Sequence, residues 1–129
     1  MQPANHLILH LTLEPETGSP TPNCAGADLA AYVRSLLDTL GTSAWAIGAT
    51  PTELTLVVSL PHTMSTAHLV YCIKRSTERW LAINAPTNPP FRWRAAYSAL
   101  TIDLRTLADA IRSVQARANA PHAHATVAA

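Results

Sequence analysis

Four strand-like and three helix-like segments in the sequence predict an α+β fold built on one antiparallel sheet. Alternation along the chain with a period of two marks the strands, and apolar residues at three- and four-residue steps mark the helices. Their order is β-α-β-β-α-β, followed by one further helix. This is the split βαβ, ferredoxin-like pattern, with helices on one face of the sheet and the first and third strands as antiparallel neighbours.

The composition is that of a folded domain. Hydrophobic residues make up 48% of the 129 residues and charged residues only 13%, which excludes the highly charged composition of intrinsic disorder. A chain of this length fits one hydrophobic core. We therefore predict a single domain over residues 1–118 and a flexible tail over residues 119–129, which contain Ala and His.

The first strand is predicted at residues 6–13, where every second residue is a leucine that should face the core. These leucines are Leu7, Leu9, Leu11 and Leu13. Residues 14–23 are rich in Pro, Gly, Ser and Thr and predict a loop. A helix follows over about residues 26–40, because apolar residues recur at helical spacing and Gly41 stands where a C-cap glycine belongs.

Two short strands, residues 43–49 and 53–60, flank the turn at residues 50–52 and predict a hairpin. Pro61 ends the second of them, and Ser65 is placed to N-cap a second helix. The inward stripe of that helix is Leu69, Cys72, Ile73, Thr77, Trp80 and Leu81.

The last third of the chain begins with a proline-rich loop at residues 84–90 and a fourth strand at residues 97–102. Asp103 is placed to cap a third helix. The inward positions of that helix are Leu104, Leu107, Ala110, Ile111 and Val114.

Charge is divided unevenly between the halves of the chain, although the net charge is only +1. Residues 1–64 carry one Arg against five carboxylates, and residues 65–129 carry eight Lys and Arg against three carboxylates. The second half is therefore suited to face a polyanion. No apolar run reaches the roughly 18 residues of a spanning helix and no signal-type stretch opens the chain, so we expect a cytoplasmic protein. Cys24 and Cys72 form no CxxC motif and are interpreted as ordinary thiols.

Three segments, in order, resemble the single-tyrosine HUH transposases of the REP-associated and insertion-sequence class. Residues 50–65 (TPTELTLVVSLPHTMS) are similar to a family stretch with Pro, Asp-His-x-His, an apolar strand and Leu-Pro-Pro-Thr-x-Ser. Residues 69–84 (LVYCIKRSTERWLAIN) resemble Leu-Val-x-x-Leu-Lys-Gly-x-Ser-Ser-Arg-Trp-Leu, with Lys74, Arg79 and Trp80 in register. Residues 91–102 (FRWRAAYSALTI) resemble Phe-x-Trp-Gln-x-Gly-Tyr-Gly-Ala-Phe-Ser-Val.

The resemblance implies DNA transposition by dimers that bind hairpin or single-stranded DNA. In the family a helix tyrosine attacks a phosphodiester, while a divalent ion held by two histidines polarises the phosphate. By position the histidines fall on Glu53 and Thr55, the tyrosine on Ser113, and a further glutamine ligand on Arg117. We therefore expect a dimeric, transposase-like DNA-binding protein that has lost cleavage and strand transfer and holds no cofactor. Mg or Mn would be required only if activity remained.

Six residues form the predicted DNA-contacting set. Guanidinium and ammonium groups suit backbone phosphates, and an indole suits base stacking. The alternative is a solvated helix face with Trp80 and Trp93 in the core. The set is Lys74, Arg75, Arg79, Arg92, Trp93 and Arg94.

Two other functions stay open. An active transposase would need a rearranged metal site, for which His6, His10 and Glu53 offer two imidazoles and a carboxylate, together with a hydroxyl nucleophile. Polar alternation on the second face of a sheet explains these residues without a metal, and Tyr97 is interpreted as structural. The other alternative is a dimeric remnant scaffold that does not bind nucleic acid.

Overall fold

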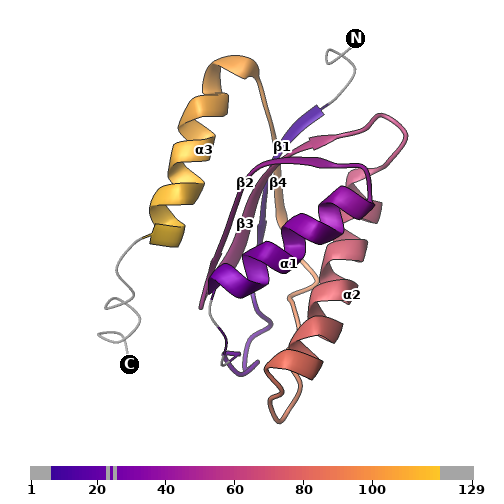
Figure 1. Ribbon diagram of the computed structural model, residues 1–129, viewed down its shortest axis with the longest axis vertical. Helices are drawn as coiled ribbons and strands as arrows, with labels where there is room; N and C mark the ends of the chain where they lie inside the picture. Colours follow the sequence, from indigo (N-terminus) through magenta and orange to yellow (C-terminus); the bar gives the residue numbers. More distant parts are fainter. Residues whose placement is uncertain (1–6, 23, 25, 120–129) are drawn as a thin grey trace.

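The computed structural model describes residues 7–22, 24 and 26–119 and contains all seven predicted elements (Figure 1). They are β1 (Leu7–Leu13), α1 (Gly26–Thr39), β2 (Ser43–Thr50), β3 (Glu53–Leu60), α2 (Thr66–Asn84), β4 (Ser98–Ile102) and α3 (Leu104–Asn119). Helix α3 runs one residue into the predicted tail; the rest of that tail, with His122 and His124, lies outside the described residues. None of the helices described is long and apolar enough to cross a membrane.

The four strands form one antiparallel sheet in the order β2-β3-β1-β4. The first and third strands pair as predicted, with Leu7 opposite Leu60 and Leu13 opposite Leu54. This strand order, combined with the order of elements along the chain, confirms the ferredoxin-like α+β fold. It leaves β2 and β4 as the two edges of the sheet.

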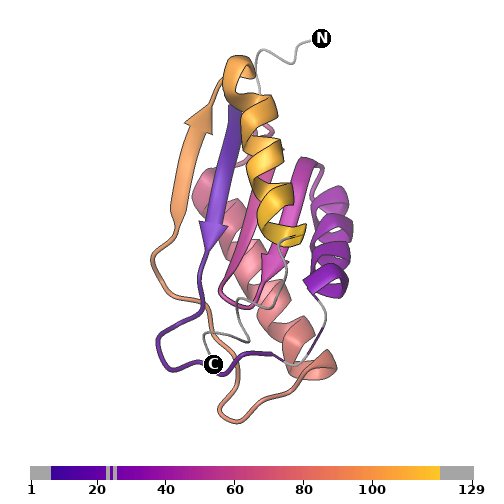
Figure 2. The ribbon, with the colours of Figure 1, turned by 90° about the vertical axis from the view of Figure 1, so that its left-hand side faces the viewer.

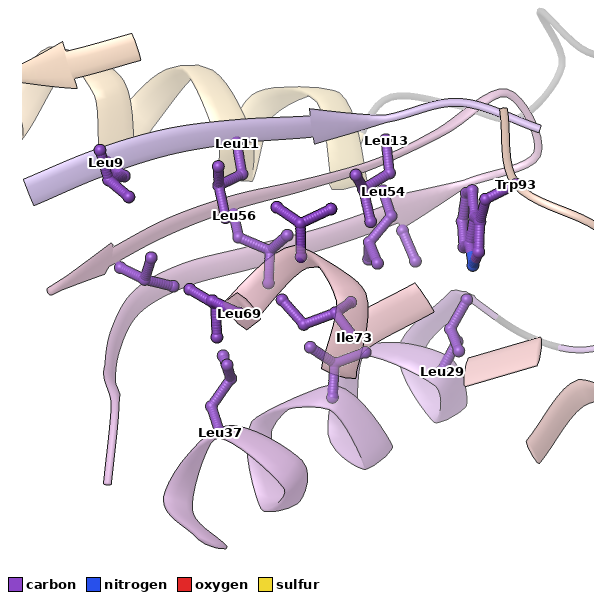
Figure 3. Close-up of a cluster of buried hydrophobic side chains, with 14 of the residues drawn as sticks. Leu9, Leu11, Leu13, Leu29, Leu37, Leu54, Leu56, Leu69, Ile73 and Trp93 are labelled. Atoms are coloured by element: carbon purple, nitrogen blue, oxygen red, sulfur yellow. The ribbon is translucent and has the colours of Figure 1, made fainter. Parts of the chain in front are cut away.

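The main core lies between the sheet and the helices α1 and α2 (Figure 3). Both central strands turn their leucines toward these helices, as the alternation predicts. The buried side chains that meet here include Leu9, Leu11, Leu13, Leu29, Leu37, Leu54, Leu56, Leu69 and Ile73. Leu7 differs from the prediction, because it begins the strand at one end of the sheet and remains 51% exposed.

Helix α3 lies on the opposite face of the sheet, over β2 and β3 (Figures 1 and 2). The buried centre of the contact is made by small side chains, since Ala110 and Val114 pack on Ala46 and Val57. A Cβ on Gly48 would meet the Val114 carbonyl oxygen at 3.0 Å, so glycine permits the close approach. Leu104 was expected to face inward, but it lies where the chain reverses from β4 and is 75% exposed.

The predicted caps fix where the helices begin and end. The Ser65 side chain accepts a hydrogen bond from the His68 backbone N–H at 3.0 Å, and Asp103 Oδ1 accepts one from the Thr106 N–H at 3.0 Å. Gly41 follows α1 with a φ of 73°, a left-handed conformation that glycine adopts without strain.

Candidate functional site

Three of the four positions that the resemblance assigns to catalysis meet on the α3 side of the sheet. Glu53 and Thr55 are alternate residues of β3 and so project from the same face. Thr55 Oγ1 donates to Glu53 Oε2 at 3.2 Å, and Arg117 Nη1 donates to the same oxygen at 2.6 Å. The Glu53 side chain is only 17% exposed, so its charge is held largely out of water. We call Glu53, Thr55 and Arg117 the Glu53 cluster.

Ser113, the fourth position, lies one helical turn before Arg117 and is exposed. A serine hydroxyl needs a neighbouring base to become a nucleophile. Arg117 cannot supply that base, because a guanidinium stays protonated in proteins. The Glu53 cluster therefore offers a neutralised carboxylate, a buried hydroxyl and a fixed cation, but no activated nucleophile.

His10 lies on the same face of the sheet, where it pairs with Val57. Glu53 lies four residues before Val57 in β3, so the register does not place His10 directly opposite Glu53. His6 falls outside the described residues. Within the described ranges, no three His, Cys, Asp or Glu side chains are grouped to hold a metal ion.

Burial and charge together favour the neutral form of His10. Burial lowers the pKa of His10 from its ordinary value, the nearby Arg117 charge lowers it further, and Glu53 partly offsets the shift by raising it. A neutral imidazole that faces a guanidinium is a poor general acid. His10 is therefore better described as part of the packing beside α3 than as a proton donor.

Tyr97 lies on the other side of the sheet from the Glu53 cluster. Its ring is on the side of α2, where the Lys74 ammonium lies 5.5 Å from the ring centroid, and it is 39% exposed. A phosphodiester bound at Glu53 could not reach this hydroxyl. The placement favours the structural interpretation of Tyr97.

Two of the predicted DNA-contacting cations are already paired with carboxylates. Arg92 forms an ion pair with Glu78 at 3.4 Å, and Arg94 forms one with Glu14 at 2.7 Å. The Arg94 backbone N–H also donates a hydrogen bond to the Glu14 carbonyl oxygen at 2.9 Å, so the segment before β4 is bound to the residue that follows β1. Both arginines still present positive charge, because their side chains remain 61% and 50% exposed.

The remaining cations of the set come from α2. The Lys74 ammonium donates to the carbonyl oxygens of Arg94 and Ala95 at 2.6 and 2.9 Å, which commits it to the chain leading into β4. Arg75 and Arg79 are exposed, and in the part of the chain that the structure describes neither forms an ion pair. They are the cations of the set that remain available to a phosphate.

Trp93 does not belong to an exposed surface. Its side chain is in the core, with the residue 7% exposed, and its indole N–H donates to Thr77 Oγ1 at 2.8 Å. The ring meets Phe91 edge to face at 4.8 Å. A base has no face of this indole to stack on, so Trp93 is corrected from a DNA contact to a core residue.

The exposed aromatic residue of α2 is Tyr71, which sequence reasoning did not single out. It is 57% exposed, and Arg75 Nη1 lies 3.5 Å from its hydroxyl oxygen. The signal was present, because a residue midway between the buried Leu69 and Ile73 projects outward on a helix. Tyr71 brings an accessible ring next to an available guanidinium.

The two cysteines carry no sign of catalysis. Both are free and half-buried. Burial raises the pKa of the Cys24 thiol, and the negative charge of Asp28 raises it further, so the reactive thiolate is disfavoured. Their interpretation as ordinary thiols agrees with these surroundings.

Comparison with known proteins finds a similar structure but no matching sequence family. No protein-family model and no curated protein matches the chain. Among solved structures, the fold is similar to that of a candidate transposase from Deinococcus radiodurans R1, with a TM-score of 0.67. The chain shares the fold of that protein. The two sequences are 18% identical over 85% of this chain and 89% of that one, which establishes the fold and not the chemistry.

Proposed function

We propose that this chain is a transposase-like protein that binds single-stranded or hairpin DNA without cutting it. The observation that carries the proposal is the Arg117–Glu53 ion pair. It sets a fixed cation against the carboxylate at a position where the resemblance requires a histidine ligand for a metal. The sequence also holds no tyrosine after Tyr97, so α3 has no phenol to attack DNA.

The chemistry of the Glu53 cluster supports loss of cleavage. In metal-assisted phosphoryl transfer a divalent ion offsets the charge that grows on the phosphoryl oxygens. Arg117 carries one positive charge, but its guanidinium is already bound to Glu53 at 2.6 Å. A phosphate at this point would have to compete with that carboxylate. We therefore expect DNA binding to require neither Mg nor Mn.

The distribution of charge supports DNA binding. Most of the Lys and Arg residues lie in the second half of the chain, and Arg75 and Arg79 stand exposed on α2 without a carboxylate partner among the described residues. Cations of this kind bind phosphates and release counterions, so binding should weaken as salt rises.

A homodimer is part of the proposal, and β4 supports it. This strand is an edge of the sheet, has no charged residue, and carries Leu100 at 59% exposure. An uncharged edge strand is a template for pairing with another strand, here that of a second copy. Light scattering on the purified protein should give a dimer that Leu100→Lys dissociates and Ile83→Lys, at an exposed site on α2, does not. A monomeric native protein would contradict the dimer.

The test of function is binding of the purified protein to labelled single-stranded, hairpin and duplex DNA over a salt series, with Mg or Mn present. Products are resolved on a denaturing gel. We expect salt-sensitive binding of single-stranded or hairpin DNA that stays intact. A cleaved strand or a covalent adduct would instead support an active transposase with a rearranged site. Absence of binding at low salt would favour a remnant scaffold.

A further inference from the structure

The outer surface of α2 carries a line of exposed side chains, one aromatic and two cationic. Tyr71, Arg75 and Arg79 follow one another at four-residue steps, so they share one side of the helix at intervals of about 6 Å along its axis. The opposite side of α2 is held in the core, where Leu69 and Ile73 are completely buried. We call Tyr71, Arg75 and Arg79 the Tyr71 strip.

An exposed tyrosine by itself needs no explanation. In the Tyr71 strip, however, the tyrosine residue is 57% exposed and a guanidinium nitrogen of Arg75 lies 3.5 Å from its hydroxyl oxygen. Arg92 and Arg94 are each paired with a glutamate, whereas no ion pair among the described residues includes Arg75 or Arg79. The arginines of the predicted set without an ion-pair partner among the described residues are therefore the two on the same side of α2 as the exposed Tyr71.

A fixed neighbour borders the Tyr71 strip on the side of β4. Lys74, on the same helix, donates to two backbone carbonyls and lies over the ring of Tyr97. This arrangement joins α2 to the chain before β4, so the helix that carries the strip is anchored on both its buried side and its flank. A ligand on the strip would meet a rigid element and not a mobile loop.

We propose that the Tyr71 strip is a contact surface for single-stranded DNA, with one base stacked on Tyr71 and phosphates bound by Arg75 and Arg79. The inference rests on the proposed DNA binding and deepens it by naming the residues and the state of the strand. An exposed ring accepts any base, but only a base freed from its duplex neighbours, as in a single strand or a hairpin loop. Guanidinium groups supply the charge that complements the backbone.

Two of the three residues of the Tyr71 strip are not part of the helix pattern that residues 69–84 resemble. In the helix pattern that residues 69–84 resemble, the position of Tyr71 is variable and the position of Arg75 is a glycine. The ring and the first guanidinium are therefore not supplied by that resemblance. Arg79 is the member that the pattern contains.

The test compares the affinity of the full chain for a labelled oligothymidylate with its affinity for an abasic oligonucleotide of the same length. The native protein should prefer the strand that has bases. Tyr71→Ala should weaken oligothymidylate binding about fivefold or more and leave abasic binding unchanged, whereas Tyr71→Phe should keep the native preference. Ile83→Ala, at a residue 74% exposed on the same helix, is the matched control and should change neither affinity.

The charge component is tested separately. A plot of the logarithm of affinity against the logarithm of salt concentration has a negative slope, and Arg75→Ala should make that slope less steep by about 0.7 because one phosphate contact to a single strand is lost. If the native protein binds the oligothymidylate and folded Tyr71→Ala binds it equally well, the proposed contact of the Tyr71 strip with DNA is contradicted. The proposed DNA binding by the protein is then still supported. If the native protein binds neither strand at low salt, the proposed function and the strip both fail.

Discussion

Arg117 on α3 and Glu53 on β3 are joined by a hydrogen bond of 2.6 Å across 64 positions of the chain. The remaining contact between α3 and the sheet is apolar and includes Ala110 and Val114. Apolar contacts are non-directional, whereas a charge-assisted hydrogen bond has a defined geometry. The polar link therefore fixes where the last turns of α3 sit.

A double-mutant cycle measures this link. Glu53→Gln and Arg117→Met should each lower the free energy of unfolding in urea, with a coupling of about 1 kcal/mol, because Glu53 is mostly buried while Arg117 remains partly in water. The matched control is the exposed pair Asp109 and Arg112, one turn apart on the same helix. Asp109→Asn and Arg112→Met should couple by no more than about 0.5 kcal/mol. Equal couplings for the two pairs would contradict a special role for Arg117.

His10 should make the fold sensitive to mild acid. Its folded pKa lies below the ordinary value of 6.5, so the unfolded chain takes up the proton first as the pH falls. The stability due to neutral His10 is present above that value and is lost as the pH falls toward the folded pKa. His10→Leu should therefore reduce the loss of unfolding free energy between about pH 7.5 and 5.5, a range above most carboxyl titrations.

The same histidine reports on Arg117. Arg117→Met removes a cation that lowers the pKa of His10, so the imidazole should titrate at higher pH when followed by NMR. His62→Gln, at an exposed histidine, is the control for the acid response. Stability curves of the native protein and His10→Leu that stay parallel over this pH range would rule out the coupling.

Trp93 should matter for stability and not for DNA. Trp93→Phe keeps an aromatic ring in the core but removes the donor to Thr77, which should cost about 1 kcal/mol of unfolding free energy. Trp93→Ala should cost about 3–5 kcal/mol because it leaves a cavity. Folded Trp93→Phe should bind single-stranded DNA as the native protein does. A loss of affinity in that variant would instead indicate that the indole of Trp93 contacts DNA.

Rebuilding the family residues tests the positions assigned by resemblance. The combination Glu53→His, Thr55→His, Ser113→Tyr and Arg117→Gln should produce cleavage of single-stranded DNA that depends on Mg or Mn, with protein joined to one product. The same combination with Ser113→Phe should bind DNA and leave it intact. A folded, DNA-binding Ser113→Tyr combination that does not cleave would show that these positions are assigned wrongly.

Sequence periodicity was sufficient for the fold because burial follows it closely. The alternation of leucines in β1 and β3 identified the core face, and the caps at Ser65 and Asp103 located two helix starts. The exceptions lie at element ends. Leu7 and Leu104 follow the pattern of a buried face but begin a strand and a helix, where the cover from other elements stops.

The candidate site was only partly accessible to such reasoning. Alternation placed Glu53 and Thr55 on one face, but their contact with Arg117 depends on which side of the sheet α3 crosses, and local periodicity does not determine that. The burial of Trp93 likewise depends on Thr77, which lies 16 positions away in sequence. Tyr71 could have been found, since its outward direction follows from its neighbours on α2.

The close seat of α3 over Gly48 also bears on how the protein is made. Every strand and the other two helices precede α3 in the chain, so during synthesis they emerge from the ribosome before it. Until then Ala46 and Val57 face water on an unfinished side of the sheet. A nascent chain stalled before α3 would therefore expose an apolar patch to chaperones, and emergence of the whole helix would cover it.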